Sequence, residues 1–398
     1  MSETVHIPQL RFPEFSGDWN RVKIQKLLDD KSIISHLDGN HGALYPRSEE
    51  FTKEGVPYVT ANDFINGKVD LKKCKCLPVE RASQFKKGIA HNGDVLFAHN
   101  ATVGPVALLE TDLEYVVLST TATYYRCDNN TLINKYLKVY LTSNDFVRQY
   151  SRVMSQSTRN QVPITTQRLF YINLPDKPEQ QKIAAFLTAV DSKIEQLSKK
   201  QELLGEYKKG AMQQIFSQAT RFKADDGNEF PDWEEKKLGD VGKVYQPKTI
   251  SQTDLTTKGF DVYGANGIIG KYSEYNHEFE QIAVTCRGNT CGTVNFTKPK
   301  SWITGNAMVV NVDDSKVVNK TFIYYQLSHT NLTYLITGSG QPQITGDIKT
   351  HKVKTPSLPE QTKIANFLSS IDSKIEQVGK QLDESKQFKK ALLQQMFV

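Results

Sequence analysis

Apolar residues recur at spacings of four and three along two long stretches of the chain, 178–217 and 359–398. Such a spacing predicts a helix with an apolar stripe on one side, the seam of a coiled coil. Pro178 and Pro359 suit the first helical turn, where a missing N–H is not felt. At 1.5 Å per residue, each helix would be roughly 50 to 60 Å long. The seam positions are Ile183, Leu187, Val190, Ile194, Leu197 and Leu204 in the first stretch, and Ile364, Leu368, Ile371, Ile375, Val378 and Leu382 in the second.

The two stretches are copies of one sequence. They align without a gap at a constant offset of 181 residues, and 20 of the 40 aligned positions are identical. Each copy opens with Pro-Glu-Gln, and Glu179 and Glu360 are placed to complement the positive end of the helix. Because one helix cannot bury its stripe alone, we expect the copies to pair within the chain as an antiparallel coiled coil. A coiled coil between two chains is the alternative.

The segments before the two helices also repeat, more faintly. Residues 93–106 (GDVLFAHNATVGPV) are similar to 286–294 (CRGNTCGTV), and both have the pattern of a strand, a turn and a second strand. This alignment places His99 on Arg287. We therefore expect the same hairpin to occur in both halves of the chain.

The remaining matches follow in the same order, since Gln161 can be set on Gln341 further along. A lead-in segment containing Phe-Pro and ending in Trp precedes each half, at 11–19 and 228–233. The pattern predicts an α+β protein in which two long helices separate two similar globular domains. The predicted layout is a lead-in and first domain over 1–177, a central helix over 178–217, a second domain over 218–358 and a C-terminal helix over 359–398.

Composition sets broad limits on the class of protein. Of the 398 residues, 38% are hydrophobic and 10% aromatic, which is enough to build folded cores. The formal net charge of +6 is compatible with nucleic-acid contact. The five cysteines never form a C-x-x-C pair, so we interpret them as reduced thiols and expect no metal site. Without a leader pattern or a long apolar run, we expect a cytoplasmic protein with no membrane contact.

Motifs for catalysis are incomplete wherever they begin. Residues 173–176 (NLPD) lack the aromatic that would stack on a flipped adenine, and the glycines around 338–340 lack a nucleotide-binding helix pattern. Residues 264–271 (GANGIIGK) have the wrong spacing for a phosphate loop. The acidic residues near Asp232 lie too close together for a metal nuclease. We expect no catalytic residue in this chain and chemistry in partner proteins.

The whole pattern resembles the specificity subunits of Type I restriction-modification systems. The resemblance rests on the RFPEF opening, on GDVLFAHNATVG and CRGNTCG, on NQVPITTQRL and QPQITGDIKT, and on the two PEQ-x-KIA-x-FL helices. It implies two target recognition domains that read the two parts of an asymmetric sequence in double-stranded DNA, with helices that set the unread spacer. It also implies two modification (methyltransferase) subunits docked on the helices and added restriction subunits. S-adenosylmethionine, ATP and magnesium would belong to those partners.

Candidate DNA contacts lie in loops that combine small residues with side chains able to read base edges. Arginine pairs with guanine, and asparagine or glutamine with adenine. Arg287 is the strongest candidate, because a guanidinium in a Gly- and Thr-rich turn has little structural reason to be there. Many of the others could simply cap turns. The candidates are Thr60, Asn62, His99, Asn100, Thr102, Arg159, Asn160 and Gln161 in the first domain, and Asn266, Arg287, Asn289, Thr290, Gln341 and Gln343 in the second.

Two other classes of function remain open from the sequence. One is a coiled-coil adaptor whose globular domains bind proteins, against which the loops rich in Arg, Asn and Gln argue. The other is an enzyme with an unrecognised site, such as a nuclease. Salt-dependent DNA binding and magnesium-dependent cleavage by the pure chain would separate these classes.

Overall fold

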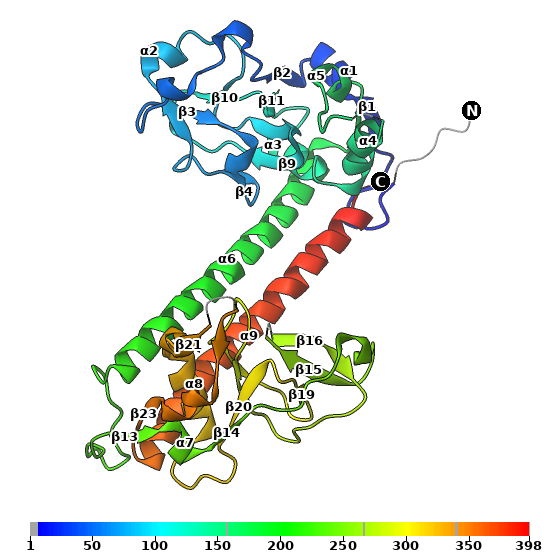
Figure 1. Cartoon of the computed structure of the whole chain (residues 1–398). Coiled ribbons are helices and arrows are strands. Elements are labelled where there is room, and N and C mark those ends of the chain that lie inside the picture. The colour runs from blue at the N-terminus through cyan, green and yellow to red at the C-terminus, as the bar shows by residue number, and fades with distance from the viewer. Residues whose placement is uncertain (1–6, 157, 266, 339–340, 398) are drawn as a thin grey trace. The chain divides into compact units, whose positions relative to one another are not determined.

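The computed structural model describes residues 7–156, 158–265, 267–338 and 341–397. They divide into two compact units: unit 1 comprises Met1–Lys199 with Gly379–Val398, and unit 2 comprises Lys200–Val378. The two long helices are α6 (Lys177–Phe216) and α9 (Leu358–Gln395), drawn in green and red in Figure 1. Each unit therefore contains a globular domain, the beginning of one long helix and the end of the other. As the sequence predicts, the fold mixes helices and sheets.

Unit 1 is built around a sheet with the strand order β2-β11-β8-β9-β5-β4 and a smaller one with the order β6-β3-β10-β7. Strands β1 and β12 pair separately and join the lead-in to the segment before α6. The strands are β1 (Asn20–Lys23), β2 (Ile33–Asp38), β3 (Val56–Val59), β4 (Phe64–Ile65), β5 (Lys68–Val69), β6 (Lys75–Leu77), β7 (Ile89–Ala90), β8 (Val95–Asn100), β9 (Thr102–Leu108), β10 (Val116–Leu118), β11 (Ala122–Cys127) and β12 (Tyr171–Leu174). The shorter helices are α1 (Ile24–Asp29), α2 (Val79–Ala82), α3 (Asn134–Tyr140), α4 (Asn144–Met154) and α5 (Ile164–Gln167).

Unit 2 repeats this topology with fewer strands. Its sheet β14-β20-β17-β18 has the order of β2-β11-β8-β9, and β16-β15-β19 has the order of β6-β3-β10. In both smaller sheets the corresponding pair, β3–β10 and β15–β19, is parallel. The strands are β13 (Glu234–Lys237), β14 (Lys243–Tyr245), β15 (Phe260–Gly264), β16 (Gly267–Tyr272), β17 (Ile282–Thr285), β18 (Val294–Phe296), β19 (Trp302–Ile303), β20 (Ala307–Asn311), β21 (Ile336–Thr337), β22 (Gln343–Ile344) and β23 (Lys352–Thr355). Its shorter helices are α7 (Leu238–Val241) and α8 (Lys320–His329). The faint repeat in the sequence thus corresponds to a shared fold.

The long helices pack against each other in both units. In unit 1, Lys389 of α9 forms an ion pair with Asp191 of α6 at 2.5 Å, and in unit 2 Lys208 pairs with Asp372 at 2.6 Å. Residues late in one helix contact residues early in the other, so the pairing is antiparallel and lies within the chain. The seam positions Ile183, Leu187, Leu197, Ile364, Leu368, Ile371, Val378 and Leu382 are buried, and Val190, Ile194, Leu204 and Ile375 are partly buried.

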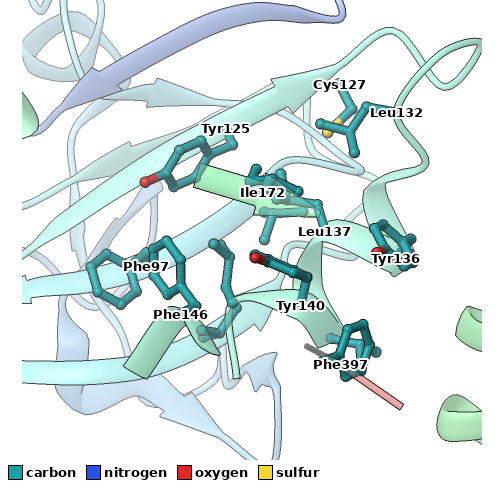
Figure 2. Close-up of a cluster of buried hydrophobic side chains, with 14 of the residues drawn as sticks. Phe97, Tyr125, Cys127, Leu132, Tyr136, Leu137, Tyr140, Phe146, Ile172 and Phe397 are labelled. Atoms are coloured by element: carbon teal, nitrogen blue, oxygen red, sulfur yellow. The ribbon is translucent and has the colours of Figure 1, made fainter. Parts of the chain in front are cut away.

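The core of unit 1 joins the domain to these helices (Figure 2). Phe397, just beyond α9, lies 6.0 Å from the ring of Tyr136 and 5.7 Å from that of Tyr140. In unit 2, Phe216 at the end of α6 takes the same place and lies 5.9 Å from Phe322. The last aromatic residue of each long helix repeat thus anchors in the globular domain of the unit where that helix ends.

The Pro-Glu-Gln motif closes each unit through its side chains. Glu179 is 2% exposed and accepts two hydrogen bonds from the Arg11 guanidinium at 2.7 Å, and one from the Trp19 indole at 3.2 Å. In unit 2, Glu360 pairs with Arg221 in the same way. The sequence predicts only that each glutamate complements the positive end of its helix. In the structure each glutamate also binds an arginine that precedes the domain, and so holds the lead-in segment against the helix.

The glutamine of the motif is equally buried. Gln180 donates to the carbonyl oxygens of Thr131 and Pro175 and accepts from the amide of Ile133, all at 2.9 Å. Gln361 makes the corresponding three bonds in unit 2, including one from the amide of Asn319 at 2.7 Å. Because the two glutamines make the same bonds, Ile133 before α3 corresponds to Asn319 before α8, and the two helices can be compared residue by residue.

Candidate nucleic-acid interface

Three loops that carry candidate DNA contacts converge in unit 1. Asn100 and Gln161 form a β-bridge, and the amide of Ala101 donates to the carbonyl oxygen of Asn160 at 3.0 Å. The loop after β3 joins them through Thr121, whose hydroxyl accepts from the amide of Ala61 at 2.9 Å. We call residues 60–62, 99–102 and 159–161 loop cluster 1.

The turn between β8 and β9 forms the centre of loop cluster 1. Ala101 has a φ of 62°, a left-handed conformation that is uncommon for a residue with a side chain. Asn62, Thr102, Arg159 and Asn160 are exposed there, and Asn100 and Gln161 are partly exposed. The side-chain amide of Asn100 donates to the carbonyl oxygen of Thr120 at 3.3 Å, which orients it. The cluster therefore offers several amide groups and one guanidinium together.

Thr60 has a local structural role. Its hydroxyl and its backbone amide both donate to the Asp63 carboxylate, at 2.8 and 2.7 Å. These bonds close the short 3-10 turn that begins at Ala61. The turn-capping interpretation therefore explains Thr60, while it leaves the exposed Asn62 unexplained.

His99 lies inside unit 1 and is not part of the exposed surface. It is 2% exposed, and its Nδ1 lies 3.2 Å from the carbonyl oxygen of Val162. Burial lowers the pKa of the imidazole, so the ring stays neutral. The prediction of His99 as a base contact is wrong for this conformation, because the polar residue at the end of β8 faces the interior.

Unit 2 assembles an equivalent surface, loop cluster 2, from residues 287–290 and 341–343. Arg287 forms a β-bridge with Gln343, and the amide of Gly288 donates to the carbonyl oxygen of Pro342 at 3.1 Å. The Thr290 hydroxyl donates to the carbonyl oxygen of Ala265 at 2.9 Å. Arg287, Asn289, Thr290 and Gln341 are exposed and Gln343 is partly exposed. Asn266 lies outside the described residues.

The backbone contacts correct the alignment of the two clusters. His99 donates to the carbonyl oxygen of Thr121 and accepts from Val162, and Cys286 makes the same two bonds with Asn306 and Ile344. Buried Cys286 is thus the counterpart of His99. It follows that Arg287 corresponds to Asn100, and Gln343, not Gln341, to Gln161.

Sequence reasoning missed the residues that hold the loops together. Thr121 bonds both the 60–62 loop and His99, and its hydroxyl lies 2.6 Å from that of Ser119. In unit 2 the hydroxyl of Thr285 donates to the carbonyl oxygen of Ala265 at 2.8 Å. The sequence does hold a signal for such residues: a short polar segment stands directly before Ala122, and another stands before Ala307, the residue aligned with it.

Neither a membrane-crossing helix nor a metal site emerges from the described ranges. Within 7–156, 158–265, 267–338 and 341–397, no helix is both long and apolar enough to cross a membrane. In the same residues, no three side chains of His, Cys, Asp or Glu gather closely enough to hold a metal ion.

Comparisons with known proteins agree with the duplicated architecture. The family described as Type I restriction modification DNA specificity domain matches residues 34–204 and 231–385. The MjaVIII type I restriction enzyme specificity subunit of Methanocaldococcus jannaschii is 24% identical, with 96% of this chain and 92% of that protein covered. A protein from the same organism, named provisionally as the MjaX specificity subunit, is 25% identical over 96% of this chain and 93% of its own length.

A solved structure shares the fold. The Type-I restriction-modification system S subunit from M. genitalium superposes with a TM-score of 0.66, covering 98% of this chain and 99% of that one, at 16% sequence identity.

Proposed function

The chain belongs to the Type I restriction-modification DNA specificity family, and from this premise we propose that each unit reads one part of a two-part DNA target. It is a specificity subunit with two target recognition domains. The observation that carries the proposal is that both units build the same loop cluster on the same backbone frame, but fill it with different side chains. Asn100 in unit 1 stands where Arg287 stands in unit 2.

The chemistry of the two clusters predicts different half-sites. Both clusters combine amide side chains, which pair with adenine through one donor and one acceptor, with one guanidinium, which matches the two acceptors of guanine. The guanidinium stands at different places, on Arg159 of the 159–161 loop in loop cluster 1 and on Arg287 of the hairpin turn in loop cluster 2. Two unlike half-sites give the target a direction, so it is asymmetric.

The partners follow from the long helices. Tyr207 of α6 and Phe388 of α9 occupy equivalent positions of the repeat, one in each unit, and are 56% and 53% exposed. Large exposed aromatic side chains at repeated positions favour two equivalent docking sites. They would hold two modification subunits, and restriction subunits would join this complex in the cytoplasm.

The chain itself is proposed to be non-catalytic. Methyl transfer and DNA cleavage would take place in the partners, which would bind S-adenosylmethionine, ATP and magnesium. The specificity subunit would bring those active sites to the DNA by holding the target on its two loop clusters.

Equilibrium binding to duplex DNA tests the recognition step. The chain, assembled with its modification subunits, should bind duplexes containing the methylated motif more tightly than scrambled duplexes, and binding should weaken linearly on a log–log plot against salt. Equal affinity for both duplexes would overturn the proposal. Magnesium-dependent cleavage by the pure chain would instead favour the nuclease class.

Subunit stoichiometry tests the docking positions. Tyr207→Ser and Phe388→Ser should each reduce the bound modification subunits from two to one, as measured by native mass spectrometry. Phe279→Ser is the matched control, because Phe279 is 60% exposed but lies outside the helices. Unchanged stoichiometry in both helix variants would remove these residues from the interface.

A further inference from the structure

A cavity of about 450 Å³ lies in unit 1, where the globular domain meets the long helices. Its walls come from the β4–β5 hairpin and β9, from α3, from the first half of α6 and from the last part of α9. All of its lining residues belong to unit 1. The charged lining residues are Lys68, Lys135, Lys138, Lys386 and Lys389, with Glu110, Asp191 and Glu195.

The lysines of this cavity outnumber the carboxylates. Lys389 is paired with Asp191 at 2.5 Å, and Lys68 lies 3.8 Å from Glu110. Across the ranges that the structure describes, Lys135, Lys138 and Lys386 have no ion pair. Glu195 alone cannot neutralise three ammonium groups, so the cavity carries a positive charge.

Lys138 is the most enclosed of these lysines. Its ammonium packs over Gly67, where an added Cβ would lie 2.9 Å from Nζ. Burial is the main cause that lowers the pKa of Lys138; the carboxylate of Asp191 opposes this shift and the ammonium of Lys389 adds to it. Because Asp191 is already paired with Lys389, a bound anion would reduce the cost of enclosing the Lys138 ammonium.

Unit 2 shows that the duplicated frame does not require this charge. Because Gln180 and Gln361 bond equivalent amides, Lys138 corresponds to Tyr324 and Val139 to Tyr325. The ring of Tyr324 lies 5.0 Å from that of Phe296, and the Tyr325 hydroxyl donates to Asp372 at 2.6 Å. Aromatic side chains thus occupy the position that a lysine holds in unit 1, beside the same Lys–Asp pair.

We propose that the lysine cavity of unit 1 binds a small multivalent phosphate, of the class of pyrophosphate or the polyphosphate group of a nucleotide. Lys138 and Lys386 bind its charge, and the hydroxyls of Thr188, Ser192 and Ser198 on α6 supply neutral donors at the wall. A cavity of this size encloses such a group. No described residue of the lining has an aromatic side chain for a base to stack on, so the phosphates carry the recognition.

Calorimetric titration of the full chain with pyrophosphate, and separately with ATP, tests the proposal at constant ionic strength. The wild-type chain should bind saturably, and Lys138→Met and Lys386→Ala should each weaken binding roughly tenfold or more, the loss expected for one charged hydrogen bond. Lys138→Tyr, which installs the residue of unit 2, should abolish binding. Lys316→Met is the matched control, because Lys316 is an exposed lysine of unit 2 that should leave binding unchanged.

The arms of the experiment separate the possible sources of the phosphate. Binding of pyrophosphate and ATP alike assigns the site to the polyphosphate, and binding of ATP alone assigns it to a nucleotide. Displacement of either ligand by duplex DNA without a target sequence would overturn the proposal and identify a DNA-backbone contact. Absence of binding by the wild-type chain, or equal binding by Lys386→Ala and the wild type, would also overturn it.

Discussion

Arg287 and Asn100 occupy one backbone position in two versions of the same turn. Sequence analysis identified both as candidates, since exposed Arg and Asn in small-residue turns are typical of base readers. The sequence alignment did not set Asn100 on Arg287, because the second hairpin has one residue more than the first between its paired strand residues. Phe97 pairs with Val106 across the first hairpin, and Val284 with Val294 across the second. Nor could the sequence reveal that the polar His99 points inward.

Substituting these two residues should affect the two half-sites separately. Arg287→Ala removes a two-donor contact, so discrimination at one base of the second half-site should fall by ~1–3 kcal/mol while the first half-site is unchanged. Asn100→Ala should do the reverse. Methylation of a duplex library by the assembled complex measures both. A loss of both half-sites in either variant would indicate damage to the fold instead.

At the scale of elements, the long helices were predictable and the sheets were not. The heptad pattern is local and occurs twice, so residues 178–217 and 359–398 could be recognised. Both helices begin one residue before those limits; α6 ends one residue early and α9 three residues early. The pairing of β2 with β11, or of β3 with β10, joins segments far apart in sequence, which no local pattern fixes. The buried role of Glu179 was hidden for the same reason, since its partner is Arg11.

The lead-in segment should contribute strongly to the stability of unit 1. Arg11→Met leaves the buried Glu179 carboxylate unpaired, which should cost ~3 kcal/mol, and Glu179→Gln in the same chain should restore most of that loss. Chemical denaturation, with hydrogen exchange to resolve the units, measures both effects. Lys182→Met is the control, because its ion pair with Glu14 is about half exposed and screened by solvent, so its loss should change the stability far less than Arg11→Met does. Equal effects of Arg11→Met and Lys182→Met would contradict this account.

The length of α6 should set the spacer of the DNA target. Deleting residues 199–202 removes about one helical turn, or roughly 6 Å, which corresponds to about two base pairs. We expect a shortened or lost spacer with both half-site sequences intact, read out by methylation of randomised-spacer duplexes. Replacing the same four residues with alanine keeps the length and should keep the spacer. A change in the half-sites themselves would contradict the proposed role of the helix.

At the scale of the whole molecule, the chain is an internal duplication of one structural unit. Each unit combines a target recognition domain with the beginning of one long helix and the end of the other, so a single duplicated sequence builds both units. The layout could be predicted because duplication leaves a constant offset in the sequence. The division of each helix between the two units could not be predicted, because it depends on which end of each helix packs into which domain.

The central claim is that two unlike half-sites are read by one chain. Base-resolution mapping of adenine methylation, in cells that contain the modification subunits with and without this gene, tests it most directly. We predict that a single asymmetric, two-part motif loses methylation when the gene is removed. Unchanged methylation, or loss at a motif with two identical half-sites, would contradict the account.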